Sequence, residues 1–224
     1  MNTELQSYIE EQSINEKKLK VERYKRLNRF ANEGQILFVG SSLMEQFPID
    51  EMQRGLGLPL EIYNRGIGGF TTIELLDNID VCILSLKPKY IFINIGTNDL
   101  NGAEYDKDTL LGNYGRILDV IKEKLPEAKV ILMGYYPVNP TFGEKLPYMK
   151  EVLKNRSNER IKMANADVAQ MAELRGLKWI DVNEGLFDVA ENLNEAYAID
   201  GMHMFADGYK VVLENLLPYL KELT

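Results

Sequence analysis

The stretch that decides the fold is Ile36-Leu37-Phe38-Val39-Gly40-Ser41-Ser42-Leu43, in which four apolar residues run into a glycine and two serines. A short apolar run of this kind is typical of a strand that is buried on both faces, as in a parallel sheet. The glycine allows the backbone to turn sharply where the strand ends. The serines therefore lie at the carboxyl edge of the sheet, where open α/β folds bind their ligands. Taken alone, the pattern favours a serine that only caps the next helix.

Composition excludes several classes of protein. The chain has 224 residues, which suits one domain with a full core, and its 45% hydrophobic and 27% charged residues are ordinary for a globular protein. A net charge of -8 at pH 7 argues against nucleic acid or an anionic membrane surface as a partner. No run approaches the ~20 apolar residues of a membrane-spanning helix. No signal-peptide pattern is present in the first twenty residues, so we expect a cytoplasmic protein.

The chain has a single cysteine and a single histidine. Cys82 lies in the apolar run 81–84, where burial in the core is the expected role. One cysteine allows no internal disulfide and no cysteine-based metal site, and one histidine excludes a site with two histidine ligands within one chain. Any imidazole chemistry within one chain must therefore use His203.

Apolar strands alternate with amphipathic helices after residue 35. Strands are expected at 36–39, 61–64, 90–95, 129–133 and 177–181, and helices over 72–86, 108–125, 148–175 and 206–223, with a linker around Pro48. The alternation predicts an α/β protein, with a parallel sheet covered by helices on both faces. Five such strands commonly take the flavodoxin-like order 2-1-3-4-5, with all carboxyl ends on one edge. This order places the loop that carries Ser42 beside the loop that carries Asn98.

Residues 1–34 are predicted to form a charged helical arm, N-terminal to a single domain over 35–224. The helix is expected over 2–32, with a break near Ser13-Ile14-Asn15. A partial apolar stripe on this helix leaves two roles open, packing on its own domain, which we favour, or binding a partner. A homodimer formed through the helix is a hypothesis.

Four short motifs fall on the carboxyl edge of the predicted sheet, and together they indicate a hydrolytic site. Asp200 and His203 are three residues apart, so the carboxylate can bind Nδ1 and leave Nε2 to take the proton of Ser42. A serine activated in this way attacks an acyl carbon, and the oxyanion that develops needs hydrogen-bond donors. The candidate donors are the backbone N–H groups of Ser42 and Gly69 and the side-chain amide of Asn98.

The same motifs resemble those of the SGNH, or GDSL-type, serine hydrolases, and in particular of bacterial proteins similar to platelet-activating-factor acetylhydrolase subunits. The matching blocks lie in the family's order at 38–42, 64–69, 96–99 and 200–203. The resemblance spans roughly residues 35–220. It implies a three-layer α/β/α flavodoxin-like fold and hydrolysis of small esters without a metal or a cofactor. It also assigns the nucleophile to Ser42, the oxyanion hole to Gly69 and Asn98, and the acid and base to the last block.

Two positions depart from the family's pattern. Ser41 stands where the family often has Asp, and Phe70 stands where an Asp often follows the oxyanion glycine. Both departures change the polarity near the site. We expect the substrate to contact these two residues together with Tyr136 and Pro137, which lie in the long loop after the fourth strand.

The leading hypothesis is a serine esterase that cleaves a small O-acyl ester, with acetyl favoured, through an acyl-enzyme on Ser42. Its expected partner is a small-molecule ester, and neither nucleic acid nor a membrane. One alternative keeps the site but transfers the acyl group to a sugar, as an O-acyltransferase. A third hypothesis is a catalytically silent flavodoxin-like binding domain. A phosphate-binding loop for flavin mononucleotide is not evident, which disfavours the third hypothesis.

Overall fold

Five parallel strands form one sheet in the order β2-β1-β3-β4-β5, as the sequence predicts. The structure is a computed structural model and describes residues 3–223. The strands are β1 (Ile36–Gly40), β2 (Ile62–Asn64), β3 (Tyr90–Asn94), β4 (Lys129–Met133) and β5 (Lys178–Ile180). Gly40 at the end of β1 pairs with Asn94 at the end of β3. The loops that follow these two central strands therefore start side by side at the carboxyl edge.

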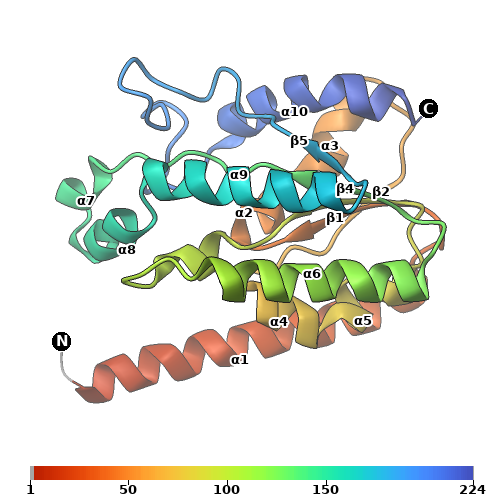
Figure 1. The fold of residues 1–224 in the computed structure, drawn as a ribbon, viewed down its shortest axis with the longest axis horizontal. Coiled ribbons are helices and arrows are strands. Elements are labelled where there is room, and N and C mark those ends of the chain that lie inside the picture. The colour runs from red at the N-terminus through yellow and green to blue at the C-terminus, as the bar shows by residue number, and fades with distance from the viewer. Residues whose placement is uncertain (1–2, 224) are drawn as a thin grey trace.

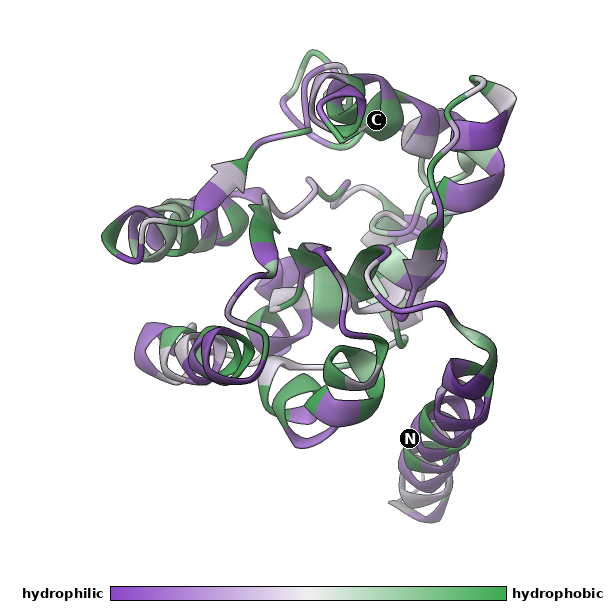
Figure 2. Cartoon of the chain, turned by 90° about the vertical axis from the view of Figure 1, so that its right-hand side faces the viewer, coloured by the Kyte–Doolittle hydropathy of each residue, from purple (hydrophilic) through white to green (hydrophobic). Residues whose placement is uncertain are grey.

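Helices cover both faces of the sheet, which makes three layers (Figures 1 and 2). One face is covered by α3 (Ile49–Gly55) and α10 (Ala206–Lys221), and the other by α4 (Thr72–Asp77), α5 (Ile79–Cys82), α6 (Lys107–Lys124) and α9 (Asn158–Leu174). Right-handed crossovers between parallel strands produce this distribution. The remaining short elements are η1 (Asn28–Phe30), α2 (Ser42–Glu45), η2 (Leu84–Leu86), η3 (Thr97–Asn101), α7 (Phe142–Lys145), η4 (Pro147–Met149) and α8 (Lys150–Asn155).

The core is centred on the two middle strands. All five residues of β1 are buried, because helices cover both of its faces. Phe38 stacks on Phe92 of β3 with ring centroids 4.7 Å apart, and meets Phe47 edge-on at 6.0 Å. Burial of one such side chain stabilises a fold by roughly 1.5–3 kcal/mol. The strand that leads to the two serines is thus fully enclosed in the core.

Three predictions for the segments that connect the strands were wrong in detail. The single helix expected over 72–86 is divided into α4, α5 and η2, because the side chain of Asn78 donates to the Glu74 carbonyl oxygen and competes with the helix. The helical region expected over 148–175 is interrupted at Arg156, and Ser157 caps α9 through the N–H of Arg160. The segment after Pro48 forms α3 instead of a linker.

The N-terminal helix α1 (Thr3–Leu27) is continuous, without the expected break. Figure 1 shows it alongside α4 and α5, with its N-terminal end reaching beyond α4. The second half is bound to the domain, because the hydroxyl of Tyr24 donates to the Gly66 carbonyl oxygen at 2.8 Å. Directly after the helix, the amide of Asn28 in η1 donates to the Val81 carbonyl oxygen. The division at residue 34 and the homodimer both stay predictions. Within residues 3–223, no helix is long and apolar enough to cross a membrane.

Candidate active site

Ser42 is the first residue of α2 and follows β1 after a one-residue turn. The turn depends on Gly40, because a Cβ there would lie only 2.0 Å from the backbone oxygen of Asn94. The carbonyl of Ser41 accepts the N–H of Glu45, which starts the short helix. The N–H of a residue in the first turn of a helix has no acceptor within that helix. Ser42 therefore presents both a hydroxyl and a backbone donor at the carboxyl edge.

The acid and base come from one tight turn before α10. Asp200 Oδ1 accepts the backbone N–H groups of Met202 and His203 at 3.0 and 2.9 Å. Gly201 adopts φ +94°, in the left-handed region that glycine tolerates best. His203 Nδ1 lies 2.6 Å from Asp200 Oδ2, and its Nε2 lies 2.8 Å from the hydroxyl oxygen of Ser42. The structure thus brings the three side chains into one hydrogen-bonded chain.

The carboxylate of Asp200 is set up to stay ionised. Burial raises its pKa, but hydrogen bonds from the ring and backbone of His203 outweigh this effect and hold the pKa below its usual range. An ionised carboxylate keeps the imidazole proton on Nδ1, so the lone pair of Nε2 faces the serine hydroxyl. Chemically, this arrangement can remove the proton of Ser42 as its oxygen attacks a carbonyl carbon.

The two loops expected to form the oxyanion hole lie together. Gly69 has φ +76°, and the neighbouring Gly68 is close to the nucleophile, since a Cβ there would lie 3.7 Å from Cβ of Ser42. Asn98 lies in η3 after β3, and its side-chain N–H donates to the Phe70 carbonyl oxygen at 2.9 Å. An amide nitrogen carries two N–H donors. The second one is the group that could bind an oxyanion.

Arg156 is a site residue that sequence reasoning missed. Its side chain is only 2% exposed, and it donates from Nη2 to Asn98 Oδ1 at 2.6 Å and from Nε to Asn101 Oδ1 at 2.9 Å. Burial lowers the pKa of Arg156 to about 10, while the carboxylates of Asp200 and Asp99 oppose that shift, so the guanidinium is charged at neutral pH. It fixes which end of the Asn98 amide faces the site. The available sequence signal is Ser157, directly after this arginine, which caps the start of α9 and so places Arg156 at a break between two helices.

Asp99 anchors the same loop from the other side. Its carboxylate accepts the backbone N–H and the hydroxyl of Thr72 at the start of α4. Burial raises the pKa of Asp99, and the hydrogen bonds from Thr72 oppose this effect. The asparagine next to Asp99 is therefore held between a half-buried carboxylate and a buried guanidinium.

The four residues expected to contact the substrate are packed inside the protein. Ser41, Phe70 and Tyr136 are 0%, 2% and 1% exposed, and Pro137 is buried as well. The polarity changes at positions 41 and 70 therefore belong to the packing beneath the site. Pro137 nevertheless lines a cavity of about 410 Å³ together with Tyr135 and Asn158. Contact of these four residues with the substrate stays a prediction.

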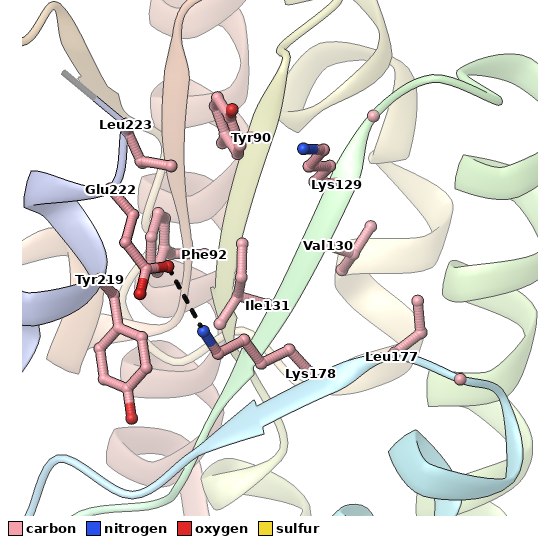
Figure 3. Close-up of a pocket in the computed structure, with 12 residues that line it drawn as sticks. Tyr90, Phe92, Lys129, Val130, Ile131, Leu177, Lys178, Tyr219, Glu222 and Leu223 are labelled. Atoms are coloured by element: carbon pink, nitrogen blue, oxygen red, sulfur yellow. Dashed lines mark ion pairs between the residues drawn. The ribbon is translucent and has the colours of Figure 1, made fainter.

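A cavity of about 440 Å³ lies away from these residues (Figure 3). Tyr90 and Lys129, the first residues of β3 and β4, line it, together with Lys178 of β5, whose Nζ lies 3.8 Å from a carboxylate oxygen of Glu222. Because these strands begin there, the cavity is at the edge opposite Ser42. It plays no part in the chemistry described above.

Comparison with known proteins indicates the family of this chain. The model of the GDSL-like lipase/acylhydrolase family matches residues 39–211. The rat platelet-activating factor acetylhydrolase IB subunit alpha2 is 28% identical over 203 residues, which cover 88% of this chain and 82% of the rat protein. An N-acylneuraminate cytidylyltransferase of Escherichia coli is 28% identical over 189 residues, which cover 84% of this chain but only 40% of that protein.

Solved structures share the fold. A Streptococcus pneumoniae structure that carries the name platelet activating factor superposes with a TM-score of 0.86 at 30% identity and covers 98% of this chain and 100% of its own. The acetylxylan esterase Axe2 of Geobacillus stearothermophilus has a TM-score of 0.63 at 17% identity, with 84% and 95% covered. Because the family match runs from the end of β1 into α10, and so takes in most of the chain, this protein belongs to the GDSL-like lipase/acylhydrolase family.

Proposed function

We propose that the protein is a serine esterase that removes a small acyl group, acetyl above all, from an O-acyl ester through an acyl-enzyme on Ser42. The observation that carries the proposal is the hydrogen-bonded chain from Asp200 through His203 to the hydroxyl of Ser42. Membership of a family of carboxylic ester hydrolases supports the class of reaction. The acyl-enzyme on Ser42 and the identity of the acyl group are the new elements.

The reaction takes place in two steps. In the first, Ser42 Oγ attacks the ester carbonyl carbon while His203 Nε2 takes the hydroxyl proton, and the bond to the alcohol breaks as the imidazolium returns that proton to the leaving oxygen. In the second, His203 removes a proton from a water molecule that attacks the acyl-serine, and the carboxylic acid leaves as the serine hydroxyl is restored. The N–H groups of Ser42, Gly69 and Asn98 stabilise the oxyanion in both steps.

Two observations favour a short acyl group. The side chains of Phe70 and Tyr136 are buried, so they offer no apolar wall to a long acyl chain. Two similar proteins also carry names that refer to acetyl esters, an acetylhydrolase and an acetylxylan esterase. Both names concern removal of the smallest common acyl group.

The test is turnover of p-nitrophenyl acetate, butyrate and octanoate by the wild type and by Ser42→Ala. We expect kcat/KM to be highest for the acetate, and the mutant to lose roughly 10³-fold or more in kcat because it lacks the nucleophile. Labelling of the wild type by a fluorophosphonate, absent in the mutant, locates the covalent step. Wild-type turnover in the mutant contradicts the role of Ser42, and a preference for octanoate contradicts the acetyl assignment.

A further inference from the structure

Helix α1 lies outside residues 39–211 that match the family model, yet it is bound to the glycine loop beside Ser42. Three of its side chains make the contact: Lys17, Lys20 and Tyr24. Their spacing of three and four residues puts them on one face of the helix. The loop they reach runs from Gly66 to Thr71 and contains Gly69.

The first two contacts hold the peptide units before Gly69. The hydroxyl of Tyr24 donates to the Gly66 carbonyl oxygen at 2.8 Å. Glu45 Oε2 accepts the N–H of Gly68 at 2.7 Å, and the same carboxylate pairs with Lys20 Nζ at 2.8 and 2.9 Å. The carbonyl group of Gly66 and the N–H of Gly68, which belong to consecutive peptide units, are thereby fixed in direction.

The third contact holds the loop after Gly69. Lys17 Nζ lies 2.7 Å from Glu74 Oε1, and Glu74 Oε2 accepts the backbone N–H of Thr71 at 2.9 Å. The stem of Lys17 also covers the glycine itself, because a Cβ on Gly69 would lie 2.9 Å from Lys17 Cε. The helix thus reaches both sides of the expected oxyanion donor.

The contacts are too buried to be ordinary surface ion pairs. The side chains are 20% and 33% exposed in the Lys17–Glu74 pair, and 31% and 26% in the Lys20–Glu45 pair, so solvent screens them less than a fully exposed pair. Glycine-rich backbone has wide conformational freedom. A donor on such a loop stabilises an oxyanion only if it is held in the right direction before the reaction.

We propose that α1 is a positioning element of the oxyanion hole, in which Lys20 and Lys17 act through Glu45 and Glu74 to hold the N–H of Gly69 toward Ser42. The inference rests on the proposed esterase function and extends it to a helix outside the matched family region. Neither lysine touches the substrate in this assignment. Both act on the rate of the chemical step through the loop.

The experiment compares two double variants. The first combines Lys17→Met and Lys20→Met, and the second, which is the control, combines Lys18→Met and Lys25→Met. Lys18 and Lys25 are exposed on the same helix, so both double variants lose two charges. We expect the first to lower kcat for p-nitrophenyl acetate about tenfold, a fraction of the loss of a whole oxyanion donor, with KM within about twofold. The control keeps wild-type kcat within about twofold. Equal kcat in the two double variants overturns the proposal.

A second measurement separates this proposal from the esterase assignment. The backbone amide resonances of Gly68 and Gly69 should shift or broaden in the Lys17, Lys20 variant and stay in place in the control. This readout needs no turnover, so it decides the role of α1 even where p-nitrophenyl acetate is not hydrolysed by the wild type. Unchanged resonances in both variants contradict the proposal.

A double-mutant cycle tests the route through Glu45. Glu45→Gln keeps an acceptor for the N–H of Gly68 but removes the charge that pairs with Lys20. If Lys20 acts through this carboxylate, Lys20→Met lowers kcat in the wild type and adds little in the Glu45→Gln background. Lys20→Arg keeps the charge and should restore most of the activity. Additive losses of kcat in this cycle would contradict an effect of Lys20 that passes through Glu45.

Discussion

The turn that carries Asp200 and His203 is closed by three hydrogen bonds among its own four residues, and distant residues also bind it at Gly201 and Met202. The loops that carry Gly69 and Asn98 are instead held by side chains from distant parts of the chain. Arg156 binds Asn98 across 58 positions, and Lys20 binds Glu45 across 25. The pairing of Asp200 with His203 is thus set by local hydrogen bonds. The oxyanion side is assembled by the tertiary fold, so its function should be sensitive to residues that never touch the substrate.

The largest effect is expected on the local side. Asp200→Asn should lower kcat by about 10³–10⁴-fold, because the amide no longer holds the imidazole with its free lone pair toward Ser42. Asp207→Asn, an exposed carboxylate in the first turn of α10, is the matched control. Steady-state kinetics with p-nitrophenyl acetate measure both. A loss below tenfold for Asp200→Asn would show that the turn does not orient the base.

A smaller but still large effect is expected at Arg156. Arg156→Met should lower kcat by roughly 10²-fold with little change in KM, because the amide of Asn98 loses the donor that fixes and polarises it. Arg156→Lys keeps a charge and one donor and should recover part of the rate. Kinetics at a temperature well below the unfolding midpoint avoid effects of lower stability.

The matched control for Arg156 is Arg160→Met. Arg160 donates to the carbonyl oxygens of Leu100, Gly102 and Ala103, so it holds the same loop without touching Asn98. The Arg160→Met variant should lower the free energy of unfolding but leave kcat largely unchanged. A cycle of Arg156→Met with Asn98→Ala should be strongly non-additive, and independent losses in that cycle would contradict the link between the two residues.

The smallest effect concerns pH and stability. The pKa of Asp200 is lowered in the folded protein, so this residue adds stability that is present above its unfolded pKa of about 3.9 and is lost as the pH falls through the folded pKa. The pKa of Asp99 is raised, so its contribution has the opposite sign: stability falls as the pH rises from about 3.9 through the raised folded pKa.

Urea unfolding of the wild type, Asp200→Asn and Asp99→Asn across this acidic range measures the two contributions. The stability advantage of the wild type over Asp200→Asn should grow with rising pH, and its advantage over Asp99→Asn should shrink. If the two stability differences changed with pH in the same direction, the two carboxylates would not have the opposite environments described above.

Much of the fold could be predicted because its signals are short-range. The runs that form β1, β3 and β4 are apolar enough to indicate buried parallel strands, and their separation by helical segments predicts the sheet order. The prediction was wrong where one polar side chain competes with a helix, as Asn78 does. Likewise, α3 was missed because Pro48 is a turn signal as well as a residue that can precede a helix.

The sequence by itself determined the strand ends that carry Ser42 and Asn98 and the turn that pairs Asp200 with His203, because periodicity and a three-residue spacing are local properties. Only the tertiary structure decided which end of the Asn98 amide faces the site, and that α1 holds the loop with Gly69. Those outcomes depend on Arg156, Lys17 and Lys20, whose partners are distant in the chain. Hydrogen bonds and ion pairs at such separations leave no spacing pattern in a single sequence.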